Sequence, residues 1–117
     1  MSKTLLACVE DLFFRSKIEA TARHLNMPVR FVAASELAKA TADGAAGAVL
    51  LELSAPDAIS AVKALRRSKA TEALPVIGFL SHVDRKLAEE AEAAGVTQVM
   101  PRSQFSETLP DLVMDLL

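Results

Sequence analysis

The feature of this sequence that most limits its fold is an alternation of short apolar runs with longer amphipathic segments. The runs show no alternation of polar and apolar residues, as expected of strands that are covered on both faces in a parallel sheet. The segments between them repeat apolar residues at helical spacing. We therefore predict a doubly wound parallel α/β sheet of five strand–helix units, with strands at residues 5–9, 29–33, 48–53, 76–80 and 96–100.

Capping residues mark the ends of the predicted helices. Asp84 is a suitable N-cap for a helix that ends at Ala94, with Gly95 as a left-handed C-cap. Ser35 is expected to cap a short, alanine-rich helix in the same way. The first four helices are accordingly predicted over residues 12–25, 35–43, 57–70 and 84–94.

The last helix contains a proline, which affects where the helix can begin. Pro110 has no backbone N–H and would cost about 3 kcal/mol in a helix interior. We therefore expect this helix to start close to the proline, with Thr108 as its N-cap and Asp111 three residues further on.

Composition excludes several classes of protein. Apolar residues make up 51% of the 117, which is enough for a core and excludes a disordered chain. The net charge of −2 argues against a nucleic-acid partner. No apolar stretch approaches the roughly 18 residues of a membrane span, and the N-terminal run is too short for a signal peptide. We expect a single domain over residues 1–117 that is soluble and cytoplasmic and contacts no membrane.

The residue types that usually hold metals or cofactors are sparse. Neither His24 nor His82 has another ligand at metal-binding spacing, so no metal is expected. Cys8 lies in a predicted central strand, where burial raises the pKa of a thiol, so no redox role is expected. The turn after the first strand is acidic and has no glycine, which argues against a nucleotide or flavin cofactor.

Three stretches keep a common order and register along the chain: Ala48-Val-Leu-Leu-Glu-Leu-Ser-Ala-Pro56, Leu74-Pro-Val-Ile-Gly-Phe-Leu-Ser-His-Val-Asp84 and Ala93-Ala-Gly-Val-Thr-Gln-Val-Met-Pro-Arg102. Together they resemble the response-regulator receiver domains of two-component (phosphorelay) signal transduction, the family of the chemotaxis receiver. The resemblance covers nearly the whole chain. It implies a flavodoxin-like sheet with the strand order 2-1-3-4-5.

The family transfers a phosphoryl group to an aspartate on the third strand, with Mg²⁺ held by two acidic residues after the first strand. A hydroxyl after the fourth strand and a lysine after the fifth bind the phosphoryl oxygens, and an aromatic residue on the fifth strand acts as a switch. By this resemblance, the aspartate, hydroxyl, lysine and switch positions fall on Glu52, on Leu80 with Ser81 beside it, on Arg102 and on Val99.

The acidic positions after the first strand depend on the register of the resemblance. They fall on Val9 and Glu10, or on Glu10 and Asp11 if the register moves by one residue. In the first register Val9 offers no oxygen to a metal ion, which leaves few protein ligands for Mg²⁺.

The differences from the family argue against phosphorylation. Glu52 is longer than aspartate by one methylene, which displaces the nucleophile, and Leu80 cannot bond a phosphoryl oxygen. Ser81 is either a displaced hydroxyl ligand or a cap of the next helix. Arg102 suits a bidentate ion pair with Glu52, so we expect these two to pair. We interpret the chain as a pseudo-receiver that binds a protein partner and is not an enzyme; the alternative is a phospho-accepting receiver with unusual ligands.

Glu52 has two interpretations, either a permanent mimic of the phosphorylated state or, as we favour, a carboxylate satisfied by Arg102 or water. Residues of the predicted fourth helix and fifth strand form the expected partner surface, because the family often uses this region. The partner is a kinase, an output protein or a second copy, and the contact residues are Arg85, Lys86, Glu89 and Val99. A basic cluster is interpreted as the solvated face of the third helix, and the alternative is a contact patch for an anionic partner; its members are Lys63, Arg66, Arg67 and Lys69.

Overall fold

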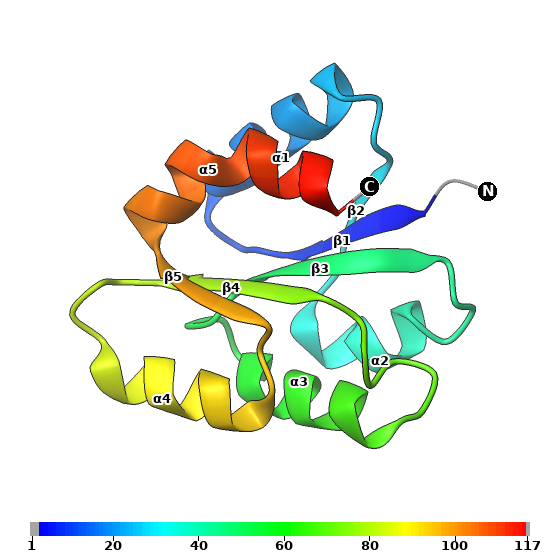
Figure 1. Cartoon of the computed structure of the whole chain (residues 1–117), viewed down its shortest axis with the longest axis vertical. Helices are drawn as coiled ribbons and strands as arrows, with labels where there is room; N and C mark the ends of the chain where they lie inside the picture. Colours follow the sequence, from blue (N-terminus) through cyan, green and yellow to red (C-terminus); the bar gives the residue numbers. More distant parts are fainter. Residues whose placement is uncertain (1–2, 117) are drawn as a thin grey trace.

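The five predicted strands form one parallel sheet in the computed structural model, which describes residues 3–116 (Figure 1). Their order is β2-β1-β3-β4-β5, so the chain reverses its winding direction after β2 and the predicted 2-1-3-4-5 topology is confirmed. The strands are β1 (Thr4–Cys8), β2 (Val29–Phe31), β3 (Ala46–Glu52), β4 (Val76–Leu80) and β5 (Gln98–Pro101).

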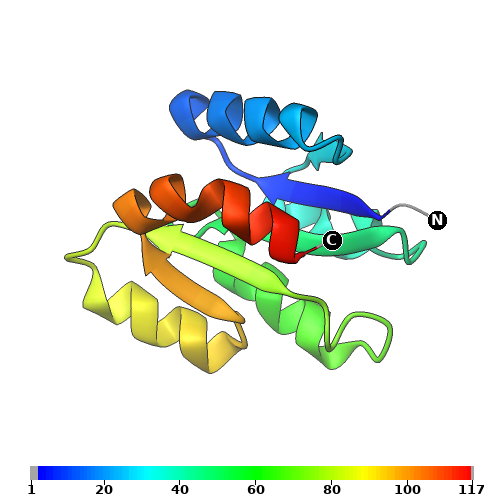
Figure 2. The same cartoon turned by 45° about the horizontal axis from the view of Figure 1, so that its top comes forward.

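Helices cover both faces of the sheet, as Figure 1 and Figure 2 show. On one face α1 (Leu12–His24) and α5 (Arg102–Asp115) lie side by side, and on the other lie α2 (Leu37–Ala40), α3 (Ala58–Arg67) and α4 (Arg85–Ala94). Alternate residues of the central strands β1, β3 and β4 enter opposite cores, which explains why these strands are almost entirely apolar, whereas the edge strands carry exposed Arg30 and Gln98.

A cluster of aromatic rings fills the core beneath α1 and α5. Phe79 of β4 stacks on Phe105 of α5 with the ring centroids 4.4 Å apart, and Phe14 of α1 lies 4.8 Å from Phe79. All three side chains are buried. This cluster fixes the start of both helices against the carboxyl end of β4, and so positions the loops that follow the strands.

The predicted ends of α4 are confirmed. The Asp84 side chain accepts a hydrogen bond from the backbone N–H of Leu87, and Gly95 adopts the left-handed conformation with φ of 108°. Gly95 is also a point of close approach, because a Cβ at this position would lie 2.8 Å from Cγ of Arg66. The position therefore favours glycine for both its backbone conformation and the space around it.

The prediction that Ser35 caps a helix is wrong. Ser35 lies inside a 3₁₀ turn over Ala34–Glu36, and the α-helix that follows, α2, has only four residues. No side chain caps either segment, and Ser35 is exposed. Burial of Ala34 and Leu37 against the sheet anchors this connection instead, so packing rather than capping determines its shape.

The prediction that the last helix starts at Thr108 is also wrong. Helix α5 begins at Arg102, directly after β5, and contains Pro110 on its exposed side. The Thr108 hydroxyl donates to the carbonyl oxygen of Gln104 within the helix. Three fully buried side chains at four-residue spacing outweigh a proline cost of about 3 kcal/mol, since each contributes roughly 1.5–3 kcal/mol; they are Phe105, Leu109 and Val113.

The lengths of the helices can be compared with the roughly 18–20 residues that a membrane-spanning helix needs. The longest helix, α5, has 14 residues. Across residues 3–116 no helix is long and apolar enough to cross a bilayer.

Candidate functional site

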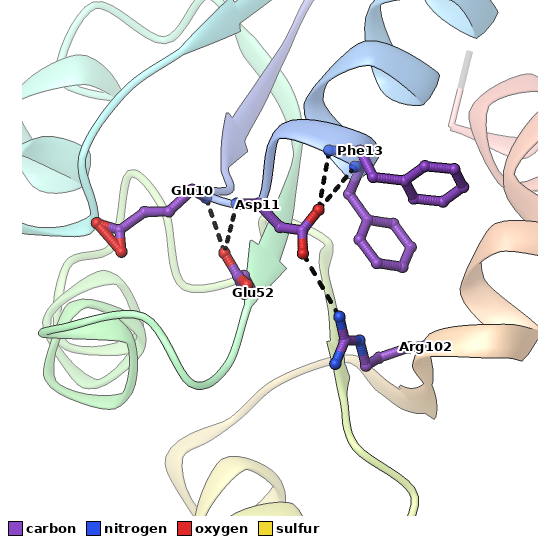
Figure 3. Close-up of polar contacts among 6 residues, drawn as sticks. Glu10, Asp11, Phe13, Glu52 and Arg102 are labelled. Atoms are coloured by element: carbon purple, nitrogen blue, oxygen red, sulfur yellow. Dashed lines mark hydrogen bonds and ion pairs between the residues drawn. The ribbon is translucent and has the colours of Figure 1, made fainter.

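All but one of the residues that the resemblance singles out lie at one edge of the sheet, where the carboxyl ends of the parallel strands meet; the exception is Val99, which lies within β5. Glu52 is the last residue of β3, and the loop that follows β1 lies directly beside it (Figure 3). Arg102 follows β5 as the first residue of α5. Parallel pairing therefore brings together residues that are separated by about 40 to 90 positions in the sequence, as expected at the carboxyl edge of an α/β sheet.

Glu52 is bonded to the backbone of the neighbouring loop. Its Oε1 atom accepts hydrogen bonds from the backbone N–H groups of Glu10 at 2.7 Å and Asp11 at 3.3 Å. The longer side chain of glutamate carries the carboxylate from the end of β3 to this loop. The negative charge of Glu52 thus fixes the connection between β1 and α1, since charge-assisted bonds to backbone N–H groups are among the stronger hydrogen bonds.

Asp11 is the N-cap of α1. Its Oδ1 atom accepts hydrogen bonds from the backbone N–H groups of Phe13 at 2.9 Å and Phe14 at 3.2 Å, and these are two of the donors that a helix start leaves unpaired. The sequence analysis missed this role. An aspartate directly before the first apolar residue of a predicted helix is the signal that would have revealed it.

The expected ion pair between Arg102 and Glu52 is wrong. Arg102 pairs with Asp11 instead, with its Nη2 atom 3.5 Å from Oδ2 (Figure 3). Its guanidinium lies 5.6 Å from the centroid of the Phe14 ring. The reason is that the bonded oxygen of Glu52 is directed to the β1–α1 loop, whereas α5 begins beside the start of α1. This long, half-exposed ion pair contributes at most about 1 kcal/mol.

The predicted acidic positions do not converge on a common point. Val9 is buried in the core, and the side chain of Glu10 is exposed and points away from Glu52 (Figure 3). Asp11 is occupied as a helix cap. Within residues 3–116 no group of three or more His, Cys, Asp or Glu side chains is placed to hold a metal ion.

Glu52 and Arg102 nevertheless line one small cavity of about 90 Å³ between β3, β4 and α5. Leu80 and Ser81 lie in the same wall, so the structure gathers four of the predicted positions. Ser54, which the sequence analysis missed, adds a hydroxyl; a single loop serine carries no distinctive signal. Leu80 is buried and offers only methyl groups to this space.

The other predicted positions lie outside this cavity. Val99 is half-buried against the core under α3 and α4, and the expected partner residues Arg85, Lys86 and Glu89 are exposed on α4. Cys8 is buried at the end of β1, as predicted, and burial raises the pKa of its thiol to about 11.

Arg66 differs from the solvated position predicted for the basic cluster. It is half-buried, and burial lowers the pKa of its guanidinium below the usual value. Its Nε atom donates to the carbonyl of Gly95 at 2.8 Å and Nη1 donates to that of Leu74 at 2.8 Å, with further bonds to the carbonyls of Thr71 and Glu72 and to the hydroxyl of Thr97. The other three members of the cluster are exposed, as expected: Lys63, Arg67 and Lys69.

Comparisons with known proteins give a structural likeness only. No family model and no curated protein matches the sequence. The solved structures that match include the chemotaxis response regulator CheY4 of Vibrio cholerae, with a TM-score of 0.82 and 21% identity over 100% of both chains. A response regulator from Hahella chejuensis matches with a TM-score of 0.85 and 17% identity over 99% of this chain and 96% of that one.

The receiver domain of a sensor histidine kinase from Pseudomonas aeruginosa, solved with a magnesium ion coordinated in its active-site cleft, matches with a TM-score of 0.84. It is 18% identical over 99% of this chain and 98% of its own. At these identities the likeness establishes the fold: this chain has the fold of response-regulator receiver domains along almost its entire length.

Proposed function

We propose that this chain, built on the receiver fold, is a signal-transduction module that binds its protein partner without being phosphorylated. The observation that carries the proposal is the position of the Glu52 carboxylate, whose Oε1 atom is bonded to the backbone N–H groups of Glu10 and Asp11. Two N–H donors stabilise the negative charge of this carboxylate and hold the side chain against the β1–α1 loop. The carboxylate is therefore a poor nucleophile that already has a structural role.

The neighbouring side chains support the same conclusion. Mg²⁺ binds oxygen ligands in near-octahedral geometry, and buried Val9 supplies none at the first acidic position. Leu80 presents an apolar wall where the resemblance implies a hydroxyl. In our proposal the pocket is a fixed structural element and the module is not an enzyme. The alternative, a phospho-accepting receiver with unusual ligands, requires Glu52 to leave the β1–α1 loop.

Incubation with acetyl phosphate and Mg²⁺, followed by intact-protein mass spectrometry, tests the proposal. We expect no added phosphoryl group, while an ordinary aspartate-containing receiver in the same reaction gains one. A matched variant combines Val9→Asp, Glu52→Asp and Leu80→Thr; phosphate uptake by this variant alone would locate the block at these three positions. A stoichiometric, base-labile adduct on the natural chain would support the alternative function instead.

We further propose that the partner binds α4 and the adjoining strand β5. Basic residues occupy the first turn of α4 and acidic residues its later turns, which opposes the helix dipole and costs roughly 0.3–1 kcal/mol for each charge at a terminus. Within residues 3–116 none of these side chains forms an ion pair. A partner with the opposite charge order would satisfy them; the residues are Arg85, Lys86, Glu89, Glu90 and Glu92.

Two partners fit this charge order. A second copy of the chain, placed with its α4 antiparallel, sets the basic turn of each helix beside the acidic turn of the other, as in a two-fold symmetric dimer. A kinase or output protein with an acidic and a basic patch on one surface fits as well. Val99, half-buried at the edge of β5, adds an apolar contact beside either partner.

A further inference from the structure

A larger hollow of about 280 Å³ lies at the same edge of the sheet and shares no lining residue with the Glu52 cavity. The ends of β1 and β2, the turn before α2 and the loop before α3 form its walls. Apolar side chains, Phe31, Val32 and Pro56 among them, and polar groups contribute about equally to the exposed lining. Small-molecule sites typically combine an apolar wall with a small number of polar groups.

Arg15 is the cation of this hollow. Its guanidinium lies 4.6 Å from the centroid of the Phe31 ring, and its Nη1 atom donates to the carbonyl of Val9 at 3.3 Å. That is its one hydrogen bond within residues 3–116, and it forms no ion pair there. A guanidinium has five N–H donors in a planar fork that fits a carboxylate. The contact with Phe31 restrains the guanidinium and leaves donors free for a ligand.

Two carboxylates, those of Glu10 and Asp57, also line the hollow. Neither side chain has an ion pair or a hydrogen bond in the described part of the chain, and both residues are exposed. With Arg15 they give the hollow one positive and two negative charges. A simple anion would meet repulsion from the carboxylates, and a simple cation would leave Arg15 unpaired. A ligand that carries both charges matches this arrangement.

The space next to these charges limits the rest of the ligand. A second hollow of about 340 Å³ shares Ala34, Ser35 and Asp57 with the first. Its remaining lining comes from alanines of α2 and α3 and from Ser60, so it carries no charge beyond Asp57. A short uncharged group fits this side, whereas a second ionic group would find no partner.

We propose that this hollow binds a small zwitterion of the α-amino-acid class with an apolar side chain. Its carboxylate pairs with Arg15, its ammonium group is placed by Glu10 and Asp57, and its side chain extends along the alanines. The proposal goes beyond partner binding and does not depend on it.

Cys8 provides a built-in reporter because it lines this hollow and is the single cysteine of the chain. Its rate of modification by methyl methanethiosulfonate is measured at mildly alkaline pH, since burial raises the pKa of the thiol to about 11. We expect L-leucine to slow the reaction in a saturable way. 4-Methylpentanoate lacks the ammonium group. Leucinamide lacks the carboxylate and is compared by amide shifts near pH 6.5, where its amine is protonated. We expect each to need at least about tenfold higher concentrations than leucine.

Amide shifts of Ala33, Ser35 and Ala55 in ¹H–¹⁵N spectra give a second readout that does not depend on thiol chemistry. We expect Arg15→Gln to weaken the leucine effect about tenfold or more. Glu10→Gln combined with Asp57→Asn removes the two negative charges of the hollow, and neither substituted side chain forms an ion pair or a hydrogen bond in the described part of the chain. Asparagine tolerates the left-handed backbone at position 57. The matched control, Arg67→Gln on exposed α3 surface, should change nothing.

Several outcomes would overturn the proposal. They are an absence of both protection and amide shifts at high leucine concentration, equal effects of leucine and 4-methylpentanoate, and an effect of leucinamide as strong as that of leucine. The second would identify a simple anion site and the third a simple cation site. Loss of the effect in Arg67→Gln would show that the response does not arise in this hollow.

Discussion

Arg66 and Arg102 lie near opposite ends of β5 and use the same chemical group in different ways. At the amino end, Arg66 donates to four backbone carbonyls and one hydroxyl on the loops before β4 and β5. At the carboxyl end, Arg102 makes one ion pair, 3.5 Å long, and its side chain is about half exposed (51%). Arg66 therefore holds loops together, whereas Arg102 remains accessible for binding.

The largest expected effect on stability is at the amino end of β5, at Arg66. Arg66→Ala leaves several carbonyls without a charged donor, and we expect the free energy of unfolding to fall by about 3 kcal/mol. Arg66→Lys keeps the charge but not the fork, so it should recover less than half of the loss. Urea unfolding measures both. The control is Arg67→Ala on the exposed side of α3, with an expected effect within about 0.5 kcal/mol; equal losses at both positions would contradict the comparison.

A smaller effect is expected at the cap beneath Arg102. Asp11→Ala removes both the N-cap of α1 and the ion pair, and should cost about 1–2 kcal/mol in urea unfolding. Asp11→Asn keeps an acceptor for the Phe13 and Phe14 N–H groups but removes the charge, so it should cost only a few tenths. If asparagine were as damaging as alanine, the ion pair rather than the cap would be the dominant interaction.

Coupling energies at the carboxyl edge should be smaller still. A double-mutant cycle of Asp11→Asn with Arg102→Gln should give about 0.5 kcal/mol or less, because the pair is long and exposed to solvent. The cycle of Glu52→Gln with Arg102→Gln should give none within error, since no ion pair joins them in the described structure. A coupling above 1 kcal/mol in the second cycle would show that Glu52 and Arg102 do form the ion pair predicted from the sequence.

The smallest effect on stability is expected on α4, where the change should appear in binding. Arg85→Glu with Lys86→Glu removes charges that oppose the helix dipole, so the melting temperature should stay the same or rise slightly. Self-association, measured by analytical ultracentrifugation, should be lost, as it should for Glu89→Lys with Glu90→Lys.

Mixing the two α4 variants distinguishes the partners. If the partner is a second copy, the mixture should associate again, because each variant supplies the charge that the other needs. If the natural chain associates and the mixture does not, the two-fold contact is wrong. If Arg67→Glu abolishes association while the α4 changes do not, the surface on α3 is the true contact.

The sequence predicted what depends on local pattern. Apolar runs located the strands, and Asp84 and Gly95 located the ends of α4. The sequence-based predictions were wrong where contacts between distant residues determine the structure. The course of α5 through Pro110 depends on burial of its opposite face, and the role of Arg66 depends on two loops that fold against it.

The candidate site shows the same limit. The resemblance to receiver domains placed Glu52, Leu80 and Arg102 at one site, and all three line one cavity. It did not identify their partners, because Glu52 binds backbone N–H groups, which every residue except proline possesses. No side-chain pattern records which backbone group will lie within reach.

The aromatic cluster under α1 and α5 has a consequence for the optical properties of the protein. The chain has no tryptophan and no tyrosine, so its near-ultraviolet circular dichroism comes from phenylalanine, and the three rings that pack together in the core should dominate it: Phe14, Phe79 and Phe105. That signal reports tertiary packing on one face of the sheet alone. The rest of the molecule is nearly transparent in this range, so a single tryptophan introduced on the other face would report independently on the second core.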